Sequence, residues 1–78
     1  MKLLSIGFGS FLASERIISV LAPDSAPIKR LIQDSRENGQ LIDASFGRST
    51  KSVVIMDNGV VILSSRGSEE LSQELLEH

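Results

Sequence analysis

Val-Val-Ile-Met-Asp-Asn-Gly-Val-Val-Ile-Leu, residues 53–63, is the stretch that decides the fold. Two apolar runs, 53–56 and 60–63, flank the short polar segment Asp57-Asn58-Gly59. Runs rich in β-branched residues favour strands, and an Asn-Gly pair between two such runs is typical of a type I′ turn in an antiparallel hairpin. The sequence therefore predicts a β-hairpin with strands at 53–56 and 60–63.

The composition of this hairpin also bears on assembly. Both strands are apolar at every position, and strands of that kind need apolar cover on both faces. A chain of 78 residues with one full helix and one short helix has few apolar residues left to cover both faces of the hairpin. We therefore expect neighbouring subunits to complete the cover, which makes a homo-oligomer the predicted working unit, with a thinly packed monomer as the alternative.

Upstream of the hairpin, the sequence delimits one helix. Within residues 23–27, Ser25 can cap free amide groups, and Pro27 suits a first helical turn because that turn lacks internal acceptors. Apolar spacing then places one face toward the core, made of Ile28, Leu31, Ile32 and Ser35. Gly39 supplies a left-handed stop, so the helix should end near Asn38.

The remaining elements are shorter. Apolar patterning predicts strands at 3–8, 16–22 and 41–46, with a bend or bulge at Gly7, Gly9 and Ser10, and a short helix capped by Ser68. The prediction is a single α+β domain, residues 1–78, with a small, mostly antiparallel sheet, one main helix and a short C-terminal helix. Residues 76–78 resemble the start of an expression tag, so His78 is given no function.

Net charge is −2, but the charges are unevenly distributed. Four acidic residues follow Arg66, while residues 1–66 hold eight basic and six acidic residues, a net charge of +2. Clustered cations rather than net charge decide whether a protein binds phosphates. The overall acidity therefore does not exclude a nucleic-acid partner.

Composition also bears on location. The absence of Cys excludes disulfides and thiolate zinc sites and indicates the cytoplasm. The apolar start of the chain is interrupted by Gly7 and Gly9 and lacks a signal cleavage motif, and no apolar run approaches the length of a membrane span. We expect a cytoplasmic protein that does not associate with membranes.

The inventory of catalytic groups is poor. The only His is residue 78, so no base is at hand to activate a Ser nucleophile. Asp34 and Glu37 share a polar helix face with basic residues, where charges are normally solvated. Residues 7–10, Gly-Phe-Gly-Ser, lack the further glycine or Gly-Lys-Ser/Thr of a nucleotide loop. We expect no enzyme, cofactor, metal or small-molecule substrate.

The richest polar segment is Gly47-Arg48-Ser49-Thr50-Lys51, which joins two predicted strands. Its cations and hydroxyls suit phosphate oxygens, although such a segment is also common as a solvated turn. Arg16 adds a third cation if the fold brings the strand ends together. With only three Phe and no Trp or Tyr, duplex contact fits better than base stacking on single strands, and Phe46 is expected in the core.

Several of these segments together resemble the RemA family of bacterial regulators, across residues 4–65. The most specific match is the run Pro23-Asp24-Ser25-Ala26-Pro27-Ile28-Lys29-Arg30. The other matching segments are Ile6-Gly7-Phe8-Gly9, Arg16-Ile17-Ile18, Ile32-Gln33-Asp34, Leu41-Ile42-Asp43-Ala44, Gly47-Arg48 and Val61-Ile62-Leu63-Ser64-Ser65.

The resemblance implies a transcriptional activator of biofilm-matrix genes with a LytTR-related subunit. It implies a ring-shaped homo-oligomer that binds or wraps double-stranded DNA and is associated with the nucleoid. It also implies DNA contact by Arg16 and by the loop at 47–51. The family usually reads Gly-Arg-Arg-Thr-Arg there, whereas this chain has Ser49 and Lys51, which removes one charge per subunit.

The sequence therefore predicts a non-enzymatic DNA-binding regulator whose repeated phosphate contacts are summed around a ring. The predicted DNA-binding residues are Arg16, Arg48, Ser49, Thr50 and Lys51. Two alternatives remain: a purely structural or protein-interaction ring, and a small-anion or nucleotide sensor. A deep pocket joining residues 7–10 to Arg48 would favour the sensor.

Overall fold

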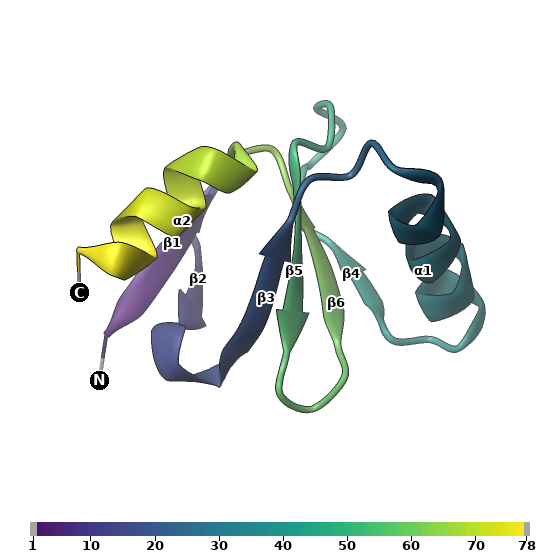
Figure 1. The fold of residues 1–78 in the computed structure, drawn as a ribbon, viewed down its shortest axis with the longest axis horizontal. Helices are drawn as coiled ribbons and strands as arrows, with labels where there is room; N and C mark the ends of the chain where they lie inside the picture. Colours follow the sequence, from purple (N-terminus) through teal and green to yellow (C-terminus); the bar gives the residue numbers. More distant parts are fainter. Residues whose placement is uncertain (1, 78) are drawn as a thin grey trace.

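The computed structural model describes residues 2–77 as two sheets and two helices (Figure 1). Strands β1 (Leu3–Gly7) and β2 (Ser10–Ala13) form one antiparallel hairpin. A four-stranded sheet has the order β3-β5-β6-β4. Its strands are β3 (Ile17–Leu21), β4 (Leu41–Asp43), β5 (Ser52–Met56) and β6 (Val61–Ser64), and only the β4–β6 pair is parallel. The predicted α+β class and mostly antiparallel pairing are confirmed.

The predicted β5–β6 hairpin is present and lies at the centre of the four-stranded sheet, but its turn differs from the prediction. Met56 donates its N–H to the carbonyl of Val60 at 2.9 Å, so the loop consists of the three residues 57–59 that the sequence places between the two runs. Gly59 is the one loop residue with positive φ, at 86°, which rules out a type I′ turn at 58–59. The Asn58 side chain instead accepts the Val60 N–H at 3.1 Å.

Elements of the same chain cover both faces of this hairpin. On one face Val53, Val61 and Leu63 pack against Ile28 and Ile32 of α1 (Ala26–Glu37). On the other face Val54 and Ile62 pack in a cluster with three buried residues of β1 and α2 (Ser68–Leu76): Leu4, Ile6 and Leu71. Figure 1 shows the sheet between α1 and the layer formed by β1, β2 and α2. The expectation that neighbouring subunits must cover the hairpin is therefore wrong.

The N-terminal region contains a strand that the sequence did not reveal. The bend predicted at residues 7–10 is the turn of the β1–β2 hairpin, and the register shifts between Ser5 and Gly7, which confirms a bulge. A 3₁₀ turn, Ser14–Arg16, then leads into β3. Between glycines and a polar turn, β2 has four residues, too few for alternation to show.

Helix α1 begins and ends where its sequence predicts. Ser25 Oγ accepts the N–H of Ile28 at 3.4 Å, and Pro27 lies in the first turn. Asn38 is the C-cap, and Gly39 has a φ of 73°. Local capping chemistry thus fixes both ends of the helix.

Several other boundaries differ from the predictions. Strand β1 ends at Gly7 rather than at residue 8, and β3 spans Ile17–Leu21 rather than 16–22. Strand β4 ends at Asp43 rather than Phe46, because Ser45 folds back onto the Asp43 carboxylate. Helix α2 exists, but its N-cap is Gly67 and Ser68 is already helical, with no side-chain cap. Within residues 2–77 no helix has the length and hydropathy to cross a membrane. His78 lies outside the described residues.

Candidate nucleic-acid interface

The predicted basic loop connects β4 to β5 and is fixed to β6 at both ends. Ala44 donates its N–H to the carbonyl of Leu63 at 2.9 Å, and Lys51 donates its N–H to the carbonyl of Ser64 at 2.8 Å. Between these anchors Arg48, Ser49 and Lys51 are exposed, and Thr50 is half-buried. The loop therefore presents its cations from a fixed base.

A tight turn shapes the start of the loop. The Asp43 carboxylate accepts both the N–H of Ser45, at 2.9 Å, and the Ser45 hydroxyl. These two hydrogen bonds hold the pKa of Asp43 below its ordinary value. Arg48 then donates its N–H to the carbonyl of Ser45 at 3.1 Å, across Phe46 and Gly47. Phe46 and Gly47 have φ of 53° and 81°, the pattern of a type I′ turn.

A second turn brings another aromatic ring to this place. Phe8 and Gly9 have φ of 54° and 75° in the β1–β2 hairpin, so the same turn pattern recurs with Phe in the same position. The ring centroids of Phe8 and Phe46 are 5.2 Å apart and the rings are tilted by 59°. The expectation that Phe46 belongs to the core is wrong, since Phe46 is 63% exposed and Phe8 51%.

Arg48 completes this cluster. Its guanidinium carbon lies 5.3 Å from the centroid of the Phe8 ring, a distance typical of a cation–π contact. Phe8, Gly47, Arg48, Ser49, Lys51 and Ser65 together line an open hollow of about 530 Å³. Sequence reasoning joined residues 7–10 to Arg48 only in the sensor alternative, and it missed Ser65, which comes from a segment far from the basic loop.

The hollow joins residue 8 to Arg48, as the sensor alternative requires, but it is open rather than deep. Small-molecule sites usually enclose most of their ligand. The geometry therefore does not favour the nucleotide-sensor alternative.

Ion pairing separates the basic residues into two groups. Arg16 pairs with Asp57 at 3.1 Å, and Arg66 pairs with Glu70, at 2.9 Å, and with Glu74. Within residues 2–77, Arg48 and Lys51 make no ion pair. Lys51 does act on Glu70, whose pKa is lowered mainly by Arg66 and also by the charge of Lys51, so Arg48 is the cation of the loop most available to an anionic partner.

Arg16 lies at the other end of the sheet from the loop. Its carbonyl accepts the N–H of Asp57 in the β5–β6 turn at 2.8 Å, whereas residues 47–51 precede the opposite end of β5. Figure 1 shows these two connections at opposite ends of the strands. Within one chain the fold does not bring Arg16 to the basic loop.

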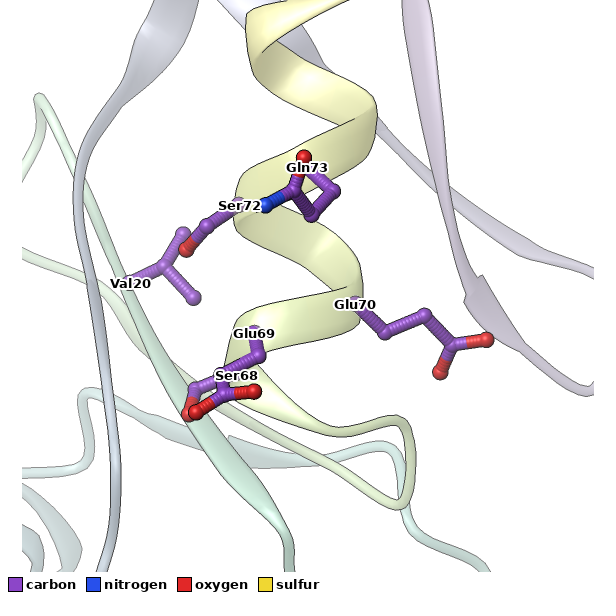
Figure 2. A pocket seen from close by; sticks show the side chains of 6 residues that line it. All are labelled: Val20, Ser68, Glu69, Glu70, Ser72 and Gln73. Atoms are coloured by element: carbon purple, nitrogen blue, oxygen red, sulfur yellow. The ribbon is translucent and has the colours of Figure 1, made fainter.

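A second hollow, of about 460 Å³, lies between α2 and β3 and has a different character (Figure 2). It is lined by Val20, Ser68, Glu69, Glu70, Ser72 and Gln73. Figure 2 shows the Glu69 and Glu70 carboxylates pointing to different sides of the helix. With two carboxylates and no cation in its lining, this hollow is unsuited to phosphate. Among residues 2–77 no group of three acidic, Cys or His side chains is placed to hold a metal ion.

Comparison with known proteins gives a family-level match. Residues 3–75 match the family model described as RemA-like, extracellular matrix regulatory protein A-like. A putative regulatory protein of Bacillus pumilus is 53% identical over 75 residues, which cover 96% of this chain and 84% of the relative. The extracellular matrix regulatory protein A of Bacillus subtilis is 49% identical with the same coverage. These relatives are named as regulators rather than enzymes.

Proposed function

The chain belongs to the RemA-like family, and on this premise we propose that it is a DNA-binding transcriptional activator of extracellular-matrix genes. It would act in the cytoplasm, at the nucleoid, as a ring-shaped homo-oligomer with a LytTR-related subunit. The observation that supports DNA binding best is the loop at 47–51. Arg48 and Lys51 are exposed there without an ion pair in the described part of the chain, on a segment anchored to β6.

These side chains suit the duplex backbone. Arg48 can bind a phosphate through two parallel N–H donors, and Lys51 adds a positive charge. The hydroxyls of Ser49 and Thr50 can donate hydrogen bonds to phosphate oxygens. Phosphate contacts of this kind position a protein on DNA without reading bases. One loop supplies few charges, so useful affinity requires several subunits on the same duplex.

Arg16 extends the same surface only if subunits adjoin. Its pair with Asp57 is solvent-exposed, and exposed pairs contribute about 0–1 kcal/mol, so a phosphate can replace Asp57 at low cost. In a ring, Arg16 of one subunit and the 47–51 loop of another can contact the backbone of the same duplex. Oligomerisation would thus join two basic sites that a single chain keeps apart.

The test is a binding series with a long duplex at increasing salt, with oligomeric mass measured for every variant. Arg48→Ala and Lys51→Ala should weaken binding and reduce the slope of log K against log salt by about one per contacting subunit. Arg30→Ala is the matched control, because Arg30 is an exposed cation on α1 and not part of the loop. Equal loss in Arg30→Ala would show that the loop has no special role.

A gain-of-function variant sharpens this test. Ser49→Arg restores the cation that the family pattern carries at this position and should steepen the salt slope by about one per contacting subunit. Tighter binding at low salt should accompany the steeper slope. An unchanged slope would place residue 49 outside the DNA contact.

A protein-interaction ring is the second candidate. Ile18 and Ile42 are exposed on β3 and β4, the two edge strands of the four-stranded sheet, where other chains can dock. An intact oligomer that fails to bind duplex DNA even at low salt would favour this candidate over the DNA-binding one.

A further inference from the structure

Two exposed phenylalanines occupy an unfavourable backbone conformation beside the basic loop. Phe8 and Phe46 each hold the first central position of a turn with the type I′ pattern, and each is followed by a glycine. That position normally takes Asn, Asp or Gly, because a left-handed backbone crowds the Cβ of a larger residue. In residues 2–77 these two Phe are the only residues other than glycine with positive φ.

Burial does not compensate for this strain in the single chain. Both rings are more than half exposed, and a bulky residue in a left-handed turn is one of the local violations that concentrate at functional sites. The rings are nevertheless held in place. Their centroids are 5.2 Å apart, and the guanidinium carbon of Arg48 lies 5.3 Å from the centroid of the Phe8 ring. The chain thus maintains a fixed, exposed aromatic pair.

We propose that the Phe8–Phe46 pair is a base-contacting wedge that presses against a base step of the duplex held by the 47–51 loop. This inference rests on the proposed DNA-binding function and deepens it. Apolar side chains that enter the minor groove partly unstack a base step and kink the duplex. Arg48, stacked on Phe8, would carry a cation to the phosphate beside that step.

Charge favours DNA over a protein partner for this aromatic pair. Arg48 and Lys51 line the same hollow as Phe8, and no acidic residue lines it. A wedge also supplies sequence preference without hydrogen bonds to base edges, because pyrimidine–purine steps such as TA unstack most easily. The protein should therefore prefer sites that place such a step opposite the pair.

The experiment compares Phe8→Asn and Phe46→Asn with the parent. Asn tolerates the left-handed turn position, so these variants remove the rings while keeping the backbone. Phe11→Asn is the matched control, because Phe11 is 58% exposed on β2 and lies outside the aromatic pair. The probe is a duplex with 2-aminopurine at a TA step and dyes at its ends, measured at saturating protein with oligomeric mass checked.

The parent and Phe11→Asn should raise 2-aminopurine fluorescence and shorten the end-to-end distance. Phe8→Asn and Phe46→Asn should lose most of both signals and bind roughly tenfold more weakly, with an unchanged salt slope. Parent-like fluorescence in both variants, while Arg48→Ala still weakens binding, would overturn the wedge and leave the proposed function standing. A smaller oligomer in both would assign the rings to a contact with a second copy and also overturn it. If the parent does not bind the duplex, the proposed function and the wedge fail together.

Discussion

Phe46 adopts a backbone conformation that glycine occupies at lower free energy. Phe46→Ala and Phe46→Gly both remove the ring and its contact with Phe8, so the difference between them reports the strain of a Cβ in the left-handed region, offset by the larger backbone entropy that Gly loses on folding. We expect the Gly variant to be more stable than the Ala variant by about 1 kcal/mol in urea unfolding. At Phe11, in a strand, the order should reverse, because Gly is ordinarily less stable than Ala. If the Gly variant is more stable than the Ala variant at both sites, or less stable at both, the turn at Phe46 is not strained.

Two buried serines face one another across the central hairpin with different hydrogen bonding. Ser64 Oγ donates to the carbonyl of Ile6 at 2.8 Å and accepts the N–H of Arg66 at 3.1 Å. Ser52, its partner in the β5–β6 register, has a buried hydroxyl with no partner among the described residues. Ser64→Ala should lower the free energy of unfolding by about 1–3 kcal/mol, whereas Ser52→Ala should leave it unchanged or raise it. Equal losses in thermal unfolding would refute this assignment.

At the scale of elements, Arg66 joins α2 to β1. Its guanidinium donates to the carbonyl of Ser5 at 2.6 Å and pairs with Glu70 and Glu74 of α2. The hydrogen bond from Arg66 holds the pKa of Glu70 below its ordinary value of 4.5. A carboxylate whose pKa is lowered by folding stabilises the fold above its unfolded pKa, and this contribution is lost as pH falls through the folded pKa.

Arg66→Met should therefore reduce the loss of stability below about pH 4.5, while lowering stability at neutral pH. The measurement is the melting temperature as a function of pH. In this variant the hydrogen bonds from Ser45 still hold the pKa of Asp43 below its ordinary value. The loss of stability at low pH should therefore become smaller but not disappear. Ser45→Ala is the complementary control, since it removes the hydrogen bond from the Ser45 hydroxyl to the Asp43 carboxylate and keeps the Arg66 pairs. If the melting temperature of Arg66→Met falls at low pH as much as that of the parent, the Arg66–Glu70 pair does not cause the acid sensitivity.

At the scale of the whole molecule, the sheet is covered on both faces but open at both edges. Ile18 on β3 is 64% exposed and Ile42 on β4 is 53% exposed. Open edge strands with apolar side chains are natural surfaces for subunit contact, and Lys on an edge strand opposes pairing. We therefore place the proposed subunit contacts at these edges rather than over the hairpin.

Ile18→Lys and Ile42→Lys should each yield smaller species in light scattering. Because the phosphate contacts are then no longer summed, affinity for a long duplex should fall by roughly 10²- to 10⁴-fold. Leu3→Lys is the control, since Leu3 is exposed on β1, outside the four-stranded sheet. Unchanged mass in both edge variants would move the subunit contact elsewhere.

The sequence by itself determined the features that depend on neighbours in the chain. These are the 53–63 hairpin, the ends of α1 at Ser25 and Asn38, and the exposed loop with Arg48. Turn chemistry, helix capping and apolar periodicity act over a few residues, so the local sequence is enough to predict these features.

Only the tertiary structure decided which distant segments meet. It covered both faces of the hairpin with the chain's own elements, brought Phe8 to Phe46, and placed Arg16 at the opposite end of the sheet from Arg48. It also assigned the type I′ pattern to two Phe-Gly pairs rather than to Asn58-Gly59. The physical reason is that contacts between distant segments depend on the packing of the whole chain, which the local sequence does not encode.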